Sequence, residues 1–548
     1  MEVLLARRLS LDAFPFARLF LVCAALLVST GQVRALDLDR ARADALVLSD
    51  ALEISATGDW DRAQALVASS DILVQDIVLW RKLRAGKGSD AEYRNYTTRR
   101  PTWPGREALD RAIFGGSSSR GGPGLSGEAA SNWRAFSRAY KRRQYEQAET
   151  LLLSVTGDRA MLGDPEVWAD RRLALARRAA REGRWNNAYR IASEHHLTPL
   201  AGYDYSDSEW VSGWVALRKL NDAPSAVQHF QKFRESVETP ISLGRGGYWL
   251  GRAYEAAGDQ PNASRWYQDA AQYQTSFYGQ LAASKVNANG LKMLTQGGLP
   301  DWRTHPTMRG DDVRLGATLH FAGQDRLAMA VFNKLGQTLP AGALAPLTRL
   351  VLDLGQPHYA VRIAKRAARR GVLILPAYYP LHEVAKYTTK VEPAFALSIA
   401  RQETELNPIA VSRAGARGLM QLMPATARRV SGWIGEEYSK SRLLTDWRYN
   451  VRLGETYLSR RTDQFSGSYV MAAAAYNAGA GRVDQWIADY GDPRLGQIDI
   501  IDWMEQIPFN ETRNYVQRVM EGLYVYRSRL ADYAGPMTIE QDLRRGFR

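Results

Sequence analysis

The chain has 548 residues, which is too many for a single hydrophobic core, so two or three domains are expected. Hydrophobic residues make up 45% and charged residues 24% of the chain, a balance that excludes an intrinsically disordered protein. The formal net charge of +14 at pH 7 favours an anionic partner such as nucleic acid, a membrane surface or a carboxylate-bearing polymer, without choosing among them.

Residues 1–35 are predicted to be a secretory signal peptide. Arg7 and Arg18 precede an apolar run over residues 19–28, and Val33-Arg34-Ala35 offers a small-residue cleavage site. The apolar run is about half the length that spans a bilayer, which favours a cleaved signal over a membrane anchor. We therefore expect a periplasmic protein with no stable membrane insertion once the signal is removed.

Residues 36–286 are predicted to form an α-solenoid of paired helices. The sequence has helical periodicity up to about residue 370 and repeats a glycine that is followed five residues later by an alanine. Such a glycine ends the first helix of a pair, and the small alanine lets the second helix pack closely, as in a tetratricopeptide repeat, which the unit resembles. The pairs are Gly58/Ala63, Gly183/Ala188, Gly258/Ala263, Gly323/Ala328 and Gly355/Ala360, with Asn221/Ala226 as a copy that has asparagine in the glycine position.

Residues 287–375 are predicted to form a smaller helical linker domain. Glycines and prolines between residues 287 and 312 interrupt the preceding helices. The segment 375–380 contains Pro376 and Pro380 and is predicted to be a stiff, non-helical connector. Residues 376–548 then form the last predicted domain.

The segment that begins at Pro393 predicts a helix with an acid on its buried face. Proline favours the first position of a helix, and the Asn407-Pro408 pair predicts its end. Phe395 and Ile399 recur at the spacing of one apolar face, and Glu403 occupies the next position of that stripe. A carboxyl group among apolar side chains has a raised pKa and can serve as a general acid. Periodicity alone leaves open that Glu403 is a solvated surface acid.

Five ordered motifs follow between residues 391 and 518. They are Gln402-Glu403-Thr404, Ser412, Gly418-Leu419-Met420-Gln421, Ala475-Tyr476-Asn477-Ala478-Gly479 and Glu511-Thr512-Arg513-Asn514-Tyr515. Together they resemble the successive motifs of the soluble lytic transglycosylases. The resemblance implies an all-α protein, in which a helical-repeat superhelix is followed by a lysozyme-like, mostly α catalytic domain.

The same resemblance assigns roles to individual residues. Glu403 is expected to be the single general acid and base. Tyr476 is expected to orient Glu403, because a buried tyrosine hydroxyl needs a partner; a plain core aromatic is the alternative. Glu511 is expected to start a helix, where an acid is favoured in any case, and to face the glycan cleft. The expected substrate-binding residues are Ser412, Met420, Gln421, Met423, Tyr476, Asn477 and Glu511. Thr404 stands where the family usually has serine, and because it keeps a hydroxyl we expect tuned rather than lost activity.

The implied function is a peptidoglycan lytic transglycosylase that cleaves the MurNAc-β-1,4-GlcNAc bond without water and leaves 1,6-anhydromuramic ends. Glycosidases normally use two carboxyl groups, whereas here a hydroxyl of the substrate replaces the second one. A hydrolytic, lysozyme-type muramidase and a non-catalytic periplasmic scaffold that binds glycan or protein are the alternatives.

Other chemistries have no signal in the sequence. The seven histidines show no metal-ligand spacing, and phosphate-binding and serine-hydrolase motifs are absent. The only cysteine, Cys23, lies in the predicted signal peptide, so a thiol nucleophile is not expected. We expect no metal, no cofactor and no nucleic-acid partner. The expected partners are peptidoglycan strands and other periplasmic cell-wall proteins, the latter bound by the helical repeats.

Overall fold

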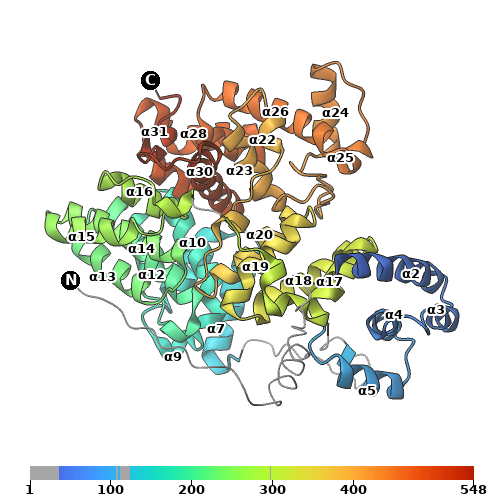
Figure 1. Ribbon diagram of the computed structural model, residues 1–548. Coiled ribbons are helices and arrows are strands. Elements are labelled where there is room, and N and C mark those ends of the chain that lie inside the picture. The colour runs from blue at the N-terminus through green and yellow to red at the C-terminus, as the bar shows by residue number, and fades with distance from the viewer. Residues whose placement is uncertain (1–35, 106–108, 111–123, 296–297, 548) are drawn as a thin grey trace, which may run out of the picture. The chain divides into compact units, whose positions relative to one another are not determined.

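The computed structural model describes residues 36–105, 109–110, 124–295 and 298–547. The predicted signal peptide and Cys23 lie outside these ranges. Within the described part every regular element is a helix, and β pairing is limited to three isolated bridges (Figure 1). None of the described helices is long and apolar enough to cross a membrane.

The chain forms two compact units, each made from two separate stretches of sequence. The first unit comprises Met1–Phe114 and Asp301–Leu335, and the second comprises Gly115–Pro300 and Gly336–Arg548. This division falls at other places than the domain boundaries after residues 286 and 375 that the sequence suggests. Those boundaries therefore stay predictions.

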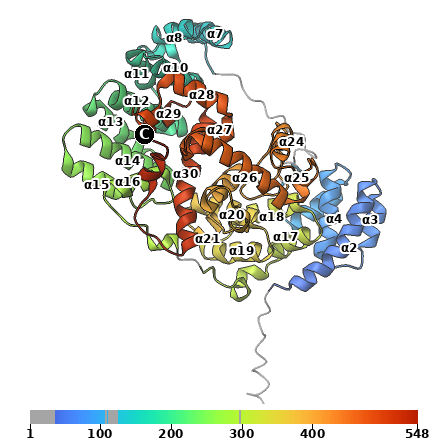
Figure 2. The same ribbon diagram turned by 90° about the horizontal axis from the view of Figure 1, so that it is seen from above.

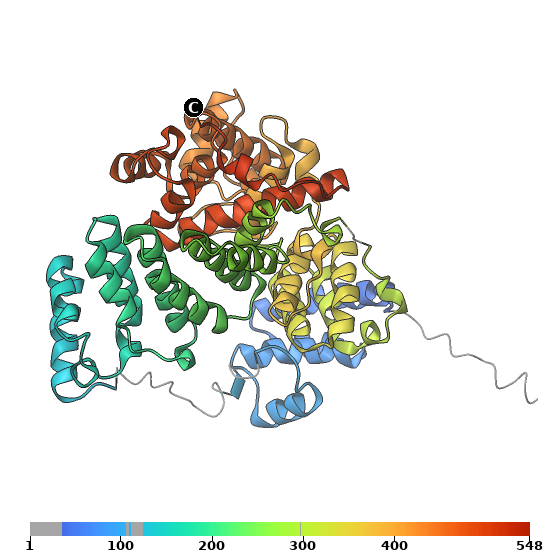
Figure 3. The same ribbon diagram turned by 90° about the vertical axis from the view of Figure 1, so that its left-hand side faces the viewer.

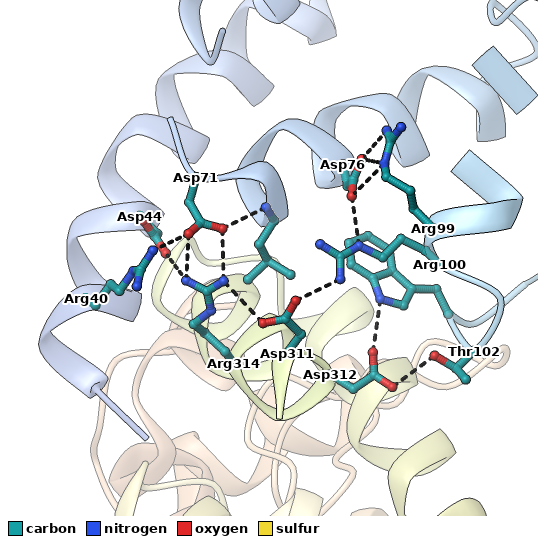
Figure 4. Close-up of polar contacts among 12 residues, drawn as sticks. Arg40, Asp44, Asp71, Asp76, Arg99, Arg100, Thr102, Asp311, Asp312 and Arg314 are labelled. Atoms are coloured by element: carbon teal, nitrogen blue, oxygen red, sulfur yellow. Dashed lines mark hydrogen bonds and ion pairs between the residues drawn. The ribbon is translucent and has the colours of Figure 1, made fainter. Parts of the chain in front are cut away.

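In the first unit, polar contacts join segments more than 200 residues apart in the sequence. Its helices are α2 (Leu38–Ala56), α3 (Trp60–Leu66), α4 (Ile72–Arg84), α5 (Asp90–Arg99), α17 (Asp311–Phe321) and most of α18 (Asp325–Thr338). Arg314 on α17 pairs with Asp71 at 2.9 Å, just before α4 (Figure 4). Asp312 accepts hydrogen bonds from Trp103 at 3.1 Å and from Thr102 at 3.0 Å. These pairs hold the 301–335 stretch against the N-terminal helices.

The repeat helices of the second unit follow one another in chain order; α7 packs against α8 and α9, and from α10 to α16 each helix packs against the next (Figures 2 and 3, cyan to green). They are α7 (Gly127–Lys141), α8 (Tyr145–Leu153), α9 (Arg159–Leu162), α10 (Ala169–Arg181), α11 (Trp185–Ser193), α12 (Tyr203–Lys219), α13 (Ala223–Glu235), α14 (Pro240–Ala256), α15 (Gln260–Ala270) and α16 (Phe277–Lys285). Stacking in this order is what a solenoid of helical pairs requires.

The predicted repeat turns are confirmed. All five glycines, and Asn221 with φ of 56°, have the positive φ that ends the first helix of each pair. The alanine five residues later is buried in every case. The structure adds one copy that the sequence pattern missed: Arg143, with φ of 60°, takes the glycine position between α7 and α8, and Ala148 is the buried alanine. Packing of the helical pair here overrides the usual preference for glycine.

The C-terminal part of the second unit is also helical throughout its regular elements. The helices are α19 (Ala341–Asp353), α20 (Pro357–Ala368), α21 (Leu375–Tyr378), α22 (Val384–Tyr387), α23 (Pro393–Thr404), α24 (Pro424–Trp433), α25 (Arg442–Thr445), α26 (Trp447–Gln464), α27 (Tyr469–Ala478), α28 (Ala480–Tyr490), α29 (Ile500–Gln506), α30 (Asn510–Ala531) and α31 (Ile539–Leu543). The prediction of a non-helical connector over residues 375–380 is wrong for its first four residues, which form α21. Pro376 lies in the first turn of α21, where its missing N–H costs nothing.

Helix α23 ends three residues before the predicted stop. The next two residues, Glu405 and Leu406, have φ of 55° and 67°. The backbone N–H of Asn407 donates to the Thr404 hydroxyl at 3.1 Å, and the Glu405 carboxylate is held by Lys365 at 2.7 Å. These side-chain contacts end the helix at Thr404, before the Asn407-Pro408 pair can do so.

Ion pairs connect the repeat helices to α29, and a hydrogen bond connects them to α30. Asp502 on α29 pairs with Arg218 of α12 at 2.6 Å. Glu505, whose side chain is 0% exposed, pairs with Arg245 of α14 at 3.2 Å and accepts a hydrogen bond from Tyr278 of α16. Glu521 on α30 accepts a hydrogen bond at 3.0 Å from the first backbone N–H of α16. The repeat helices and the C-terminal helices thus share one interior.

Candidate active site

Glu403 lies near the end of α23, where this helix packs beside α30 (Figure 1). The two helices approach closely because Gly522 of α30 faces Ser398 of α23; a Cβ at Gly522 would lie 2.8 Å from the Ser398 hydroxyl oxygen. Glu403 is half-buried, and its Oε1 accepts a hydrogen bond from the Tyr515 hydroxyl at 2.8 Å. The acid that periodicity placed on the buried face of the helix therefore has a single side-chain partner among the hydrogen bonds of the described residues.

The surroundings of Glu403 favour its protonated form. Burial raises the pKa of Glu403 to about 7, the Tyr515 hydrogen bond opposes this shift, and the negative charge of Glu511 adds to it. A carboxyl group with a pKa near neutrality can hold a proton at pH 7 and release it to a leaving group. This is the electrostatic state that the apolar stripe predicted.

Helix α30 brings two residues to the acid from one face. Glu511 lies in the first turn, as predicted, and is exposed; Tyr515 follows four residues later and is buried. Residues four apart on a helix share a face, so the charge of Glu511 and the hydroxyl of Tyr515 both act on Glu403. Tyr515 belongs to the last motif, but sequence reasoning gave it no role. Its spacing from Glu511 was the available signal.

The predicted contact between Tyr476 and Glu403 is wrong. The Tyr476 hydroxyl donates instead to the backbone carbonyl of Met420 at 2.8 Å. Tyr476 is close enough for the charge of Glu403 to raise its pKa, although burial contributes more. The hydroxyl prefers the carbonyl because Tyr515 already occupies Glu403 Oε1 and the Met420 carbonyl needs a donor in the interior. Tyr476 thus fixes the loop beside the acid.

Ser412 and Gln421 stabilise the loop between α23 and α24, Ser412 in its middle and Gln421 near its end. The hydroxyl of Ser412 accepts a hydrogen bond from the backbone N–H of Ala416 at 3.0 Å, and its side chain is exposed. Gln421 has φ of 49°, and its amide donates to the carbonyls of Ala410 at 3.1 Å and Gly418 at 2.9 Å. Both side chains order the backbone of the loop.

The two methionines of the loop have different environments. Met423 is 42% exposed and lies just before α24, so a ligand can reach it. Met420 is 0% exposed and packs against Gly454, where an added Cβ would come within 2.5 Å of its sulfur. This burial corrects the prediction that the Met420 side chain lines a substrate site. Met420 belongs to the core beneath the loop.

Asn450 is a residue of this region that sequence reasoning missed, and Gly418, which begins the third motif, was given no role of its own. Asn450 is fully buried on α26; its Oδ1 accepts from Met420 N at 2.8 Å, and its Nδ2 donates to the carbonyl of Arg417 at 2.9 Å. Gly418 has φ of 77°, and a Cβ there would lie 2.1 Å from the Leu443 carbonyl. A buried asparagine inside a helix is unfavourable unless it has such partners, and this was the only signal for it.

Thr404 and Asn477 connect the site to its supports. The Thr404 hydroxyl donates to the carbonyl of Leu419 at 2.9 Å, so it ties the end of α23 to the loop. The side-chain Oδ1 of Asn477 accepts a hydrogen bond from the Thr512 hydroxyl at 2.7 Å, which joins α27 to the first turn of α30. The hydroxyl retained at position 404 is thus a structural link within the site. Among the described residues, no group of three or more His, Cys, Asp or Glu side chains could hold a metal ion.

Comparison with known proteins identifies the class of domain that carries this site. Residues 380–495, which include Glu403 and Tyr476, match the Transglycosylase SLT domain family. The chain therefore contains a transglycosylase SLT domain, and the resemblance drawn from the motifs is confirmed for this region.

A curated relative makes the likeness more specific. A stretch of 150 residues is 39% identical to the soluble lytic murein transglycosylase of Escherichia coli K12 and covers 27% of this chain and 23% of that protein. The match thus spans about a quarter of the length of the curated relative.

Solved structures extend the likeness to the whole fold. One is an inactive mutant of the lytic transglycosylase Slt from Pseudomonas aeruginosa, with 23% identity, a TM-score of 0.50, and coverage of 94% of this chain and 91% of that chain. Another is the complex of the 70-kDa soluble lytic transglycosylase with bulgecin A, with 18% identity, a TM-score of 0.50, and coverage of 91% and 98%. The expected fold class, a helical-repeat superhelix followed by a lysozyme-like domain, is confirmed.

Proposed function

We propose that this protein is a periplasmic peptidoglycan lytic transglycosylase with Glu403 as its single general acid and base. The observation that carries the proposal is a half-buried carboxyl group with a pKa raised to about 7, inside a transglycosylase SLT domain. The 39% identity of a 150-residue stretch to a soluble lytic murein transglycosylase supports the substrate, the glycan strands of the cell wall.

The proposed reaction cleaves the MurNAc-β-1,4-GlcNAc bond in two proton transfers. Protonated Glu403 gives its proton to the glycosidic oxygen as the bond to the anomeric carbon breaks. The C6 hydroxyl of the same muramyl residue then attacks that carbon, and the Glu403 carboxylate takes its proton. The product is a 1,6-anhydromuramic end, and water is not consumed. A hydroxyl held beside the reacting carbon has a large entropic advantage over a free water molecule.

Loop and helix residues around Glu403 are proposed to bind the glycan. Met423, Ser412 and Glu511 are exposed and can contact it directly. Gln421, Tyr476 and Asn477 hold the backbone that forms the site. The helical repeats are proposed to bring the enzyme to the cell wall or to other periplasmic proteins.

Hydrolysis by a lysozyme-type mechanism is the second candidate, because Glu511 acts on Glu403 from the neighbouring helix and is itself a carboxylate. A hydrolytic enzyme would use such a group as nucleophile or as base for water. Glu511 is exposed in the first turn of α30, whereas Tyr515 makes the hydrogen bond to the acid. This arrangement favours a substrate contact for Glu511.

Digestion of purified sacculi in ¹⁸O-labelled water, followed by mass spectrometry, separates the two reactions. We expect 1,6-anhydromuramic ends without label. The E403Q variant is the negative control, and a hydrolytic muramidase is the positive control for label uptake. Label at the new ends would replace the transglycosylase proposal by hydrolysis. If the folded protein cleaves nothing, the remaining candidate is a non-catalytic scaffold that binds glycan or protein.

A further inference from the structure

The turn that follows the acid has a backbone conformation that needs support from the rest of the structure. Glu405 and Leu406 have φ of 55° and 67°, so two consecutive residues other than glycine lie in the left-handed region. A residue with a Cβ rarely adopts this region, and such strain persists only where the surrounding structure holds it. Leu406 is fully buried and is held by the core. Glu405 is not fully buried and requires other contacts.

One face of α20 supplies these contacts. His358, Arg362 and Lys365 follow one another at spacings of four and three residues, which places them on one face of the helix. Lys365 Nζ lies 2.7 Å from one carboxylate oxygen of Glu405, and Arg362 Nη1 lies 3.2 Å from the other. His358 Nδ1 lies 3.2 Å from the Glu405 carbonyl oxygen, which can only accept, so this nitrogen carries the hydrogen. Three groups of one helix thus contact a single residue.

The two ion pairs are partly shielded from water. The Glu405 side chain is 22% exposed. Burial by itself would raise its pKa, but the charges of Lys365 and Arg362 outweigh burial and hold the pKa below its ordinary value. The carboxylate is therefore charged at neutral pH. A carboxylate with two cationic partners restrains the backbone more firmly than a single exposed pair does.

The restrained residue lies two positions after the acid. The backbone N–H of Glu405 donates to the carbonyl of Arg401 at 2.9 Å, and this bond closes the last turn of α23 around Glu403. The burial of Glu403 and its hydrogen bond from Tyr515 depend on where that turn lies. Helix α20 lies outside residues 380–495, which match the transglycosylase SLT domain. The acid is therefore supported by a helix that the matched segment does not contain.

We propose that His358, Arg362 and Lys365 are positioning residues for Glu403, which they hold in place by fixing Glu405. The inference rests on the proposed function, because it takes Glu403 as the acid. The three side chains act through the backbone and have no part in the proton transfers. A reacting group that is misplaced by about 1 Å can lose about a hundredfold in rate, so a firmly held turn matters for cleavage.

Steady-state cleavage of soluble glycan strands by the full chain tests the proposal. E405Q keeps the size of the side chain but removes its charge, so kcat should fall by about tenfold or more while KM changes by less than about twofold. K365M should lower kcat in the same way, and K365R, which keeps the cation, should lower it less. The double variant E405Q/K365M should be no slower than E405Q, because both changes remove the same contact. Circular dichroism checks that each variant is folded.

The pH–rate profile separates positioning from a plain charge effect. If the turn moves, Glu403 loses burial, so its pKa falls and the alkaline limb of the profile moves to lower pH. In K365M the missing cation by itself would move the limb to higher pH. A shift to lower pH in K365M therefore reports a displaced acid. A limb that stays in place or moves to higher pH overturns the proposal.

R369Q is the matched control. Arg369 is exposed at the end of α20 and is not among the groups that contact Glu405, so this variant should leave kcat and the profile unchanged. Wild-type kcat in folded E405Q, additive losses in the double variant, or an equal loss in R369Q overturns the inference alone, since cleavage by the wild type still upholds the proposed function. If the wild type itself cleaves nothing, the proposed function fails and the inference fails with it.

Discussion

Two glutamates beside α30, the half-buried Glu403 and the fully buried Glu505, have opposite electrostatic environments. Glu403 has one hydrogen bond, from Tyr515, and burial raises its pKa to about 7. Glu505 is also buried, which alone would raise its pKa, but the charges of Arg245, Arg513 and Arg177 outweigh burial and hold its pKa below the usual range. The first carboxyl group can exchange a proton at neutral pH, whereas the second stays charged.

The comparison shows that burial alone does not decide whether the pKa of a glutamate is raised or lowered. The same helix supplies both environments, because Glu511 and Tyr515 face Glu403, whereas Arg513 and Gln517 face Glu505. Opposite faces of the same turns of α30 therefore contact a carboxyl group with a raised pKa and one with a lowered pKa. At these two sites the difference lies in the guanidinium groups, because three act on Glu505 and none is among the groups that shift the pKa of Glu403.

The largest effect is expected from removing the proton of Glu403. E403Q keeps the shape of the side chain but has no acidic proton, so cleavage of sacculi should fall by about a hundredfold to ten-thousandfold. Release of soluble glycan fragments, measured by chromatography, checks this. The folded variant should retain the helical content of the wild type by circular dichroism. Wild-type turnover in a folded E403Q protein would remove Glu403 from the mechanism.

Replacing Glu505 is expected to reduce the stability of the fold. E505Q leaves Arg245, Arg177 and Arg513 buried without their anion, which should lower the free energy of unfolding by about 3–5 kcal/mol. Denaturant titration measures the loss, and E511Q, which neutralises an exposed acid nearby, should change it by less than about 0.5 kcal/mol. An equal loss in both variants would mean that the arginine cluster does not need Glu505.

The raised pKa of Glu403 should also appear as a pH-dependent cost in stability. Between its ordinary value of 4.5 and the folded value of about 7, the native state binds more protons than the unfolded state, so wild-type stability falls as pH rises through this window. E403Q lacks this titration and should exceed the wild type by about 1–3 kcal/mol at pH 8 and match it at pH 4. A difference in stability between E403Q and the wild type that is the same at all pH values would contradict the raised pKa of Glu403.

Tyr515 and Tyr476 provide a matched pair for testing what sets the pKa of Glu403. Y515F removes the hydrogen bond that stabilises the carboxylate, so the pKa should rise and the alkaline limb of the pH–rate profile should move up by about one unit. Y476F loses a bond to the Met420 carbonyl and should move the limb less. The reverse ranking in pH–rate profiles would restore Tyr476 as the partner of the acid.

The smallest effect is expected at Glu511. E511Q removes a negative charge that raises the pKa of Glu403, so the alkaline limb should move down by a few tenths of a unit, and less at high salt. Profiles recorded at two salt concentrations measure this. A hundredfold loss of rate instead would make Glu511 a catalytic carboxylate and favour hydrolysis.

Local signals in the sequence predicted much of this molecule. Glycine at the repeat turns and the apolar stripe around Glu403 are patterns that a few neighbouring residues define, and both are confirmed. The hydrogen-bond partners of Tyr515 and Tyr476 were not predictable from the sequence, because they depend on how closely α30 approaches α23 at Gly522 and Ser398. The burial of Met420 likewise depends on Gly454, which lies more than 30 residues away in the sequence.

The buried acids of α29 and α30 limit whether the C-terminal helices, α19 to α31, can evolve as a protein without the repeat helices. Asp502, Glu505 and Glu521 are neutralised or hydrogen-bonded by residues of the repeat helices. A descendant that discarded the repeats would leave these carboxylates on a newly exposed face beside their remaining apolar neighbours. With its present sequence, the segment is therefore not expected to fold stably without the repeat helices. Relatives of similar catalytic fold that lack the repeats are expected to carry neutral side chains at these three positions, and an alignment of such proteins would reveal the exchange.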